Sequence, residues 1–198
     1  MERLWSPWRL KYIEGAAASQ CVFCDAAATA PLHAAASTEP PAHDAAHRTT
    51  STTPHGAPGT APSAPDAVPD DLVVARRPLA FVILNLYPYN NGHLMVVPNR
   101  HIASLAAATD DELTEVMRLV RDSEVVLHEA YHPQGVNVGI NLGRAAGAGI
   151  ADHLHVHLVP RWSGDSNFMS VIGETRVLPE TLEQTASRLR PVFHRLLD

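Results

Sequence analysis

The chain of 198 residues is 45% hydrophobic and 18% charged, within the usual range of globular proteins. Its 2 cysteines exclude a disulfide framework and favour a reducing, cytoplasmic setting. The formal net charge of −6 argues against a broad basic surface for a nucleic acid polymer. No apolar stretch approaches the ~20 residues of a membrane span, and the N-terminus lacks the apolar region of a secretory signal.

The N-terminal segment, residues 1–25, ends in a Cys-x-x-Cys pair, Cys21 and Cys24. Such a pair is typical of a zinc knuckle, of a redox pair, or of two small buried side chains, and a zinc site needs two further ligands. Trp5, Trp8 and Tyr12 lie near helical spacing, which favours packing or a dimer contact over a cofactor site.

Residues 26–67 consist almost entirely of Ala, Pro, Thr, Ser, His and Gly. A segment with so few large apolar side chains cannot offset an ordering entropy of ~1–2 kcal/mol per residue, so we predict a disordered linker. The segment contains four histidines, His33, His43, His47 and His55. Their irregular spacing favours a solvated tether over a metal-binding tract.

Residues 68–198 carry the regular patterns of a folded domain. Residues 72–90 hold two β-branched and aromatic runs broken at Arg76–Pro78, which predicts a hairpin. Residues 93–98 predict a third strand that ends at Pro98.

A helix is predicted between Thr109 and Tyr131, with Thr109 or Asp110 as its N-cap and Pro133 and Gly135 ending it. Its apolar residues near the helical period are Leu113, Val116, Met117, Val120 and Val125.

Two alternating segments follow this helix. In the first, Val136, Val138 and Ile140 alternate with polar or small residues, which predicts a strand with one buried face. A Gly/Ala loop over 143–149 leads to a second strand, residues 153–162, and residues 177–197 predict a C-terminal helix. Strands joined by short loops around one long helix indicate an α+β fold on a mainly antiparallel sheet.

The second alternating segment places three histidines, His153, His155 and His157, on one strand face. They are open to three interpretations: a row of solvent-facing side chains, a metal site built from all three, or a phosphate-chemistry site. The loop from Asn141 to Gly149 favours the third, because its small residues let backbone N–H groups approach an anion closely. Such a loop leading into histidines pairs an anion cradle with a nucleophile of pKa ~6.5.

These residues resemble the histidine triad (HIT) family. The segment His-Leu-His-Val-His-Leu-Val at 153–159 resembles the signature of the family. Asn141 and the glycines that follow it resemble the phosphate loop of the family. Asn85 followed by His93 is similar to its ribose-contacting segment. The runs LWSPWR, CVFC and VPRWSGDSNFMSVIG resemble a bacterial branch that includes diadenosine tetraphosphate phosphorylases. The resemblance covers about residues 1–25 and 70–198.

The resemblance implies a HIT-like fold with an antiparallel sheet of about five strands, a long helix, a C-terminal helix and a homodimer. It also implies that His155 attacks the α-phosphorus of a nucleotide and forms a nucleotidyl-histidine, while His157 hydrogen-bonds the phosphate or the leaving group. The nucleotide-binding residues are then Asn85, Asn141, Gly147, Gly149, His157 and Trp162. For Trp162, a core role is as good an interpretation as stacking on a base.

In metal-containing members of the family, the Cys-x-x-Cys pair joins two histidines around zinc. The matching ligands here are Cys21, Cys24, His101 and His153. A closed Cys₂His₂ tetrahedron is a structural site, which would hold the N-terminal segment on the sheet. The resemblance implies no organic cofactor.

The expected activity is phosphorolysis of a dinucleoside polyphosphate by a nucleotidyltransferase. One departure concerns the acceptor: many family members carry Gln or Ser four residues before the first triad histidine, where this chain has Gly149. A hydrolase of nucleoside phosphoramidates or dinucleoside polyphosphates is therefore the nearest alternative, and a non-catalytic, zinc-stabilised nucleotide-binding module is an alternative of another class.

Overall fold

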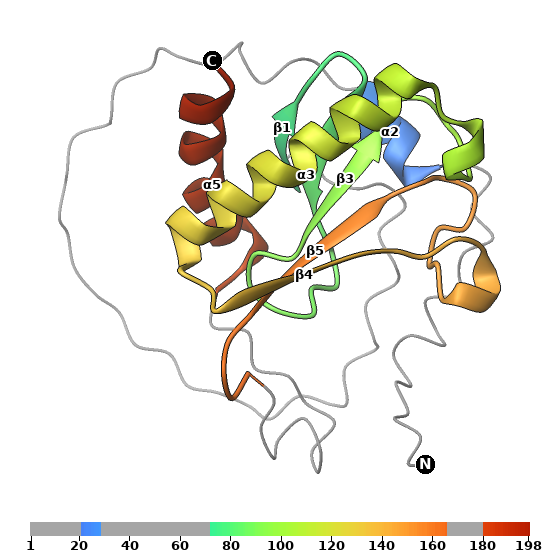
Figure 1. Cartoon of the computed structure of the whole chain (residues 1–198). Coiled ribbons are helices and arrows are strands. Elements are labelled where there is room, and N and C mark those ends of the chain that lie inside the picture. The colour runs from blue at the N-terminus through green and yellow to red at the C-terminus, as the bar shows by residue number, and fades with distance from the viewer. Residues whose placement is uncertain (1–20, 29–71, 166–179) are drawn as a thin grey trace, which may run out of the picture.

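The computed structural model describes residues 21–28, 72–165 and 180–198. Within them, five antiparallel strands form one sheet in the order β1-β2-β3-β5-β4. The strands are β1 (Val73–Arg76), β2 (Ala80–Leu84), β3 (Leu94–Pro98), β4 (Gly135–Ile140) and β5 (Val156–Arg161). Helices α3 and α5 lie in front of the sheet, and α2 lies behind it (Figure 1). The predicted α+β architecture is confirmed.

The centre of the sheet is apolar on both faces. Every residue of β2 and β3 is buried, as their continuous runs of aliphatic residues require. The predicted hairpin joins β1 to β2, and the Arg77 N–H closes its turn on the Ala80 carbonyl at 2.8 Å. The third predicted strand ends at Pro98, as expected.

Strand β4 corrects one prediction, because it has no fully buried face in the single chain. Val136 and Ile140 are half-buried, and the side chain between them, Val138, is 51% exposed. The physical reason is its place at the edge of the sheet, since α3 packs against β2, β3 and β5 instead.

Helix α3 (Asp110–Tyr131) begins at a capping box. Thr109 accepts a hydrogen bond from the Glu112 N–H at 3.2 Å, and the Glu112 carboxylate accepts one from the Thr109 N–H at 2.8 Å. The same carboxylate also binds the Arg100 guanidinium at 2.6 Å. The Arg100 guanidinium and the cap together lower the pKa of Glu112 to about 2. The helix ends at Tyr131, and its C-cap residue, His132, adopts the left-handed conformation with φ of 47°.

The buried stripe of α3 differs from the predicted one in two places. Val116 and Val120 face the core as expected, but Met117 is 58% exposed and Val125 is 47% exposed. The core positions in the middle and second half of the helix are instead taken by Leu119, Ser123, Val126 and Leu127. Helical spacing of the apolar residues alone thus does not determine which of them face the core.

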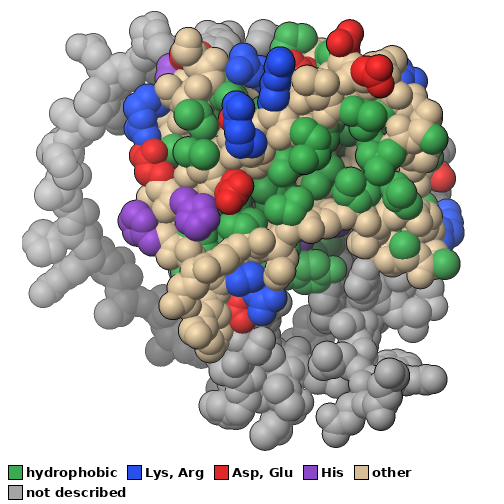
Figure 2. Space-filling model, in the orientation of Figure 1, with side chains coloured by type: hydrophobic (Ala, Val, Ile, Leu, Met, Phe, Trp, Pro, Cys, Tyr) green, Lys and Arg blue, Asp and Glu red, His purple; other side chains and the backbone are tan. Residues whose placement is uncertain are grey.

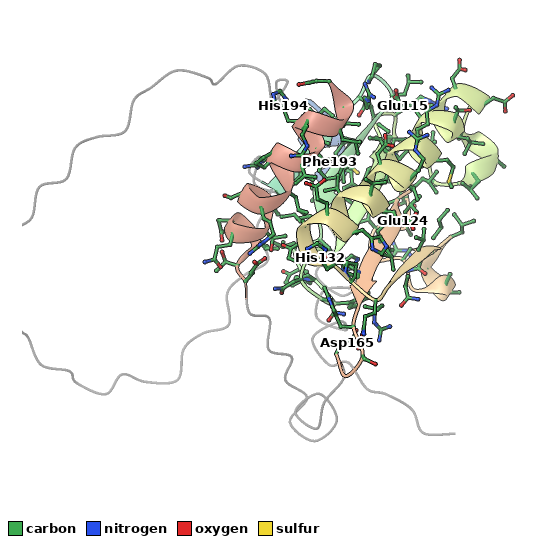
Figure 3. All side chains as sticks on the ribbon, turned by 60° about the vertical axis from the view of Figure 1, so that its left-hand side comes forward. Glu115, Glu124, His132, Asp165, Phe193 and His194 are labelled. Atoms are coloured by element: carbon green, nitrogen blue, oxygen red, sulfur yellow. The ribbon has the colours of Figure 1, made fainter. Side chains whose placement is uncertain are left out.

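Helix α5 (Leu182–Leu197) packs against α3 and β1. It begins at Leu182, later than the predicted start at residue 177, because Thr181 and Gln184 form a capping box there. Phe193 is 1% exposed and points into the space between α5 and the rest of the helix layer (Figure 3). No helix in the described part of the chain could cross a membrane.

Helix α2 (Val22–Ala28) carries the Cys-x-x-Cys segment back onto the sheet. Phe23 and Ala26 are each 2% exposed and belong to the core, and Arg76 donates a 2.6 Å hydrogen bond to the Ala26 carbonyl. The predicted linker boundary at residue 26 is therefore too early, since residues 26–28 are helical. Residues 29–67 and the aromatic residues Trp5, Trp8 and Tyr12 lie outside the described residues.

Candidate active site and metal centre

The three histidines of the alternating segment lead into β5. His153 is 1% exposed and His155 is 4% exposed, so a row of solvent-facing histidines is excluded. Only His157 lies within β5, which begins at Val156, so the predicted strand starts too early. The extended segment before it is held by the Leu154 N–H, which donates to the Ile102 carbonyl at 2.6 Å.

His155 has its two ring nitrogens in different environments. Nδ1 lies 2.8 Å from the backbone carbonyl of His153. Because a carbonyl oxygen only accepts hydrogen bonds, Nδ1 carries the proton and Nε2 carries the lone pair. Burial lowers the pKa of His155, which keeps the ring neutral. A neutral imidazole with an oriented lone pair is a competent nucleophile.

His157 is joined to a histidine of another strand. Its Nδ1 lies 3.0 Å from Nε2 of His93, the residue just before β3. His93 is buried, and its Nδ1 accepts a hydrogen bond from the Tyr89 N–H at 3.1 Å. The strand register explains why His93 and His157 lie close together. Met95 of β3 pairs with His157 of β5, and His93 is two residues before Met95. From the sequence, His93 was named only as part of the segment that resembles the ribose-contacting one, and its contact with His157 was not predicted.

Asn85 lies at the same end of the sheet. Its Oδ1 accepts a hydrogen bond from the Tyr87 N–H at 3.0 Å, and its Nδ2 lies 3.4 Å from His93 Nε2. The structure therefore brings Asn85 beside the pair of His93 and His157.

The predicted phosphate loop begins next to the segment that carries His155. Ile140 pairs with Val156, so the following residue, Asn141, continues toward His155 in the antiparallel direction. Gly147 has a φ of 89°, a left-handed conformation that favours glycine. Gly149 is half-buried in the turn before the histidines. The loop thus leads directly to His153.

Trp162 lies in the turn that follows β5. Its backbone N–H lies 3.3 Å from a carboxylate oxygen of Asp165, and the same carboxylate accepts hydrogen bonds from Arg161 and from the buried Asn90. The Arg161 guanidinium holds the pKa of Asp165 far below its usual range. Figure 3 shows Asp165 in this turn, at the end of the sheet away from α5. The turn is well anchored, and both roles of the half-buried indole stay predictions.

Four side chains behind the sheet converge on one point. The ligand atoms of Cys21, Cys24, His101 and His153 all lie within 4.8 Å of one another. Nδ1 of His153 is 3.3 Å from Cys21 Sγ and 3.7 Å from Cys24 Sγ, and Nδ1 of His101 is 3.3 Å from Cys24 Sγ. A zinc tetrahedron with bonds of about 2.0–2.3 Å has edges of roughly 3.3–3.8 Å, so the four residues fit this metal.

The surroundings of the four ligand atoms also suit a cation. His153 Nε2 lies 2.9 Å from the Pro98 carbonyl, which leaves Nδ1 as the lone pair that faces the cysteines. Burial and the neighbouring Cys21 thiol raise the pKa of Cys24 to about 11, because two thiolates repel one another. A divalent cation removes that cost when it binds both sulfurs.

The four-residue ligand cluster and His155 both contact His153 and Phe23. The ring of His153 faces the cysteines while its carbonyl oxygen holds Nδ1 of His155. Phe23, between the two cysteines in sequence, lies with its ring centroid 5.4 Å from that of His153 and 5.2 Å from that of His155. A displacement of α2 would therefore change the position of the His155 ring.

Comparison with known proteins identifies relatives over this part of the chain. The family model described as "HIT domain" matches residues 67–164. The AP-4-A phosphorylase of Mycobacterium tuberculosis is 48% identical over 126 residues, which cover 64% of this chain and 65% of the relative. An uncharacterised HIT-like protein of Methanocaldococcus jannaschii is 36% identical over 98 residues, which cover 50% of this chain and 72% of the relative. The chain thus spans slightly under two thirds of the tuberculosis relative.

Among solved structures, a zinc-bound histidine triad family protein from Mycobacterium smegmatis superimposes with a TM-score of 0.53 at 26% identity. The match covers 63% of this chain and 85% of that one. A relative that holds zinc on the same fold agrees with the donor set found here.

Proposed function

The chain belongs to the histidine triad family, and we propose that it cleaves a dinucleoside polyphosphate, foremost diadenosine tetraphosphate, at an α-phosphate. The observation that carries the proposal is the orientation of His155, whose Nδ1–H is bound by the His153 carbonyl at 2.8 Å while the lone pair on Nε2 points the other way. The activity named for the Mycobacterium tuberculosis relative supports the choice of substrate.

In the first step, Nε2 of His155 attacks the α-phosphorus of the substrate. A bond from Nε2 to phosphorus forms, and the bond from phosphorus to the bridging oxygen breaks, so ATP leaves and AMP stays attached to His155. The carbonyl of His153 stabilises the positive charge that develops on the imidazole ring. His157 donates a hydrogen bond to the phosphate or to the departing oxygen.

In the second step, an acceptor attacks the same phosphorus, and the bond from phosphorus to Nε2 breaks. Inorganic phosphate as the acceptor yields ADP, and water yields AMP. Asn141 and the backbone N–H groups around Gly147 and Gly149 stabilise the charge on the non-bridging oxygens. Asn85 contacts the ribose, and Trp162 stacks on a base.

Zinc has a structural role in this proposal. When bound by the two cysteines, His101 and His153, it supplies a cross-link between α2 and the segment that carries the nucleophile. Both cysteines are free thiols in the structure, and thiolate ligands persist in a reducing compartment, so we place the protein in the cytoplasm.

Product analysis with diadenosine tetraphosphate, with and without inorganic phosphate, tests the activity. We expect ATP and ADP only when phosphate is present, because the activity named for the Mycobacterium tuberculosis relative is that of a phosphorylase. Anion-exchange chromatography of the products separates ADP from AMP.

Each other result has a definite meaning. ATP and AMP in both tubes would make the protein a hydrolase with water as the acceptor. An absence of products in either tube, together with measured nucleotide binding, would overturn the enzymatic proposal in favour of a nucleotide-binding module.

We also propose that the protein is a homodimer formed through α3 and β4. Figure 2 shows hydrophobic side chains gathered over this face of the molecule. Among them, Met117, Val125, Val138 and Leu142 are each at least 45% exposed. In the described sheet β4 is an edge strand, so its outer side offers backbone groups to a second copy.

A charged residue in this surface is expected to separate the subunits. Val138→Lys places an ammonium group in the proposed interface and is expected to raise the dimer dissociation constant by about 100-fold or more. Leu196→Lys is the matched control, because Leu196 is 43% exposed but lies in α5, outside the proposed interface. Sedimentation velocity measures both; a monomeric parent protein, or a Val138→Lys variant that dimerises normally, contradicts the proposal.

A further inference from the structure

We infer that His93 is a positioning residue that fixes the tautomer of His157, so that His157 presents an N–H donor to the substrate. The inference rests on the proposed function for its catalytic consequence, whereas the tautomer itself follows from the contacts of three residues. These contacts form a chain from the Tyr89 backbone through the His93 ring to the His157 ring.

The chain starts at a group that can only donate. The Tyr89 N–H lies 3.1 Å from Nδ1 of His93, and a backbone amide nitrogen has no lone pair to offer. Nδ1 of His93 must therefore be the acceptor and carry no proton. A neutral imidazole with an unprotonated Nδ1 carries its proton on Nε2.

The proton on Nε2 of His93 then determines the state of its neighbour. Nε2 lies 3.0 Å from Nδ1 of His157, a good distance for N–H to N hydrogen bonding. His93 donates, so Nδ1 of His157 accepts and its proton lies on Nε2. The amide of Asn85 does not compete, because its Nδ2 is a donor 3.4 Å away and its Oδ1 is already bound to the Tyr87 N–H.

The ring of His93 is held in this orientation by its surroundings. It is 1% exposed and stacks on the Tyr89 ring with centroids 5.0 Å apart and planes 22° apart. Gly92, just before it, has a φ of 74°, and a Cβ there would lie 3.0 Å from the Tyr131 ring. A flip of the His93 ring would break the bond from the Tyr89 N–H and leave that partly buried donor unsatisfied.

The tautomer matters because the substrate is an anion. A phosphate oxygen accepts hydrogen bonds, so His157 stabilises it through Nε2–H and would repel it through a lone pair. Fixing the donor before the substrate arrives is electrostatic preorganisation, which avoids a reorganisation cost during the reaction. His93 thus acts on the reacting atoms through His157.

Three variants separate this role from simple packing. His93→Leu fills the space without a donor, and we expect kcat to fall about 10–100-fold with KM changing by less than about threefold. His93→Gln offers an amide N–H near the position of Nε2, and we expect it to recover most of that loss. Tyr89→Phe keeps both the stacked ring and the backbone N–H, so its tautomer signature is expected to match the parent protein.

The tautomers are read directly from two-bond ¹H–¹⁵N correlations of ¹⁵N-histidine-labelled protein at neutral pH. We expect both His93 and His157 to show a protonated Nε2 and an unprotonated Nδ1, and His93→Leu to lose this pattern at His157. A protonated Nδ1 on His157 of the parent protein overturns the inference, as does a His93→Leu variant with unchanged kcat. The spectra decide the tautomer even if the parent protein turns over no dinucleoside polyphosphate, so failure of the proposed function is recognised separately.

Discussion

Replacing His155 with asparagine is expected to abolish turnover of diadenosine tetraphosphate while leaving nucleotide affinity within a few-fold of the parent protein. Asparagine keeps a polar side chain beside the His153 carbonyl but has no lone pair on a basic nitrogen. Loss of the only atom that forms the bond to phosphorus is expected to lower kcat by about 10⁴-fold or more. Steady-state kinetics measure kcat, and calorimetric titration with a nucleoside monophosphate measures affinity.

His132→Asn is the matched control for this experiment. It makes the same substitution at the exposed end of α3, where φ is 47° and asparagine tolerates the left-handed conformation. We expect its kcat to equal that of the parent protein. Substantial turnover in His155→Asn would assign the nucleophile to another group, with His157 the next candidate in the triad.

Removing the two cysteines is expected to cost the protein its zinc and much of its stability. The double variant Cys21→Ala, Cys24→Ala loses half of the donor set, so α2 is no longer cross-linked to His101 and His153. We expect about one zinc per chain in the parent protein and a destabilisation of at least about 3 kcal/mol in the variant, since structural zinc contributes directly to folding.

Elemental analysis and thermal unfolding measure these two effects without reference to activity. A strong chelator is expected to lower the Tm of the parent protein toward that of the double variant and to leave the variant unchanged. A parent protein purified without added metal that holds far less than one zinc per chain, with both cysteines freely alkylated in the native state, would contradict the metal site.

Much of the fold follows from local patterns in the sequence. The β1–β2 hairpin was predictable because two β-branched runs flank Pro78, and α3 because Thr109 and Glu112 form a cap ahead of helical periodicity. The exposure of Val138 and Met117 could not be predicted in this way. Whether a strand is central or at an edge, and which side of a helix meets the sheet, depends on contacts between distant segments that periodicity does not contain.

The candidate site divides in the same way. Alternation placed His155 and His157 on one side of their segment, and the resemblance to a family supplied the four metal ligands that the structure brings within 4.8 Å. The hydrogen bond from His93 to His157 joins residues 64 positions apart. It depends on the pairing of Met95 with His157 in the sheet, and nothing in either local sequence encodes that register.

The left-handed turn at Gly92 has a consequence for substitutions in α3. Gly92 lies against Tyr131 and Leu127 of α3, and the very next residue, His93, reaches the triad on the other side of the sheet. A single peptide unit therefore separates the layer that supports the fold from the residues proposed to perform the chemistry. A bulkier side chain at either α3 position would therefore press on Gly92 and disturb the position of His93 as well as the packing of the helix.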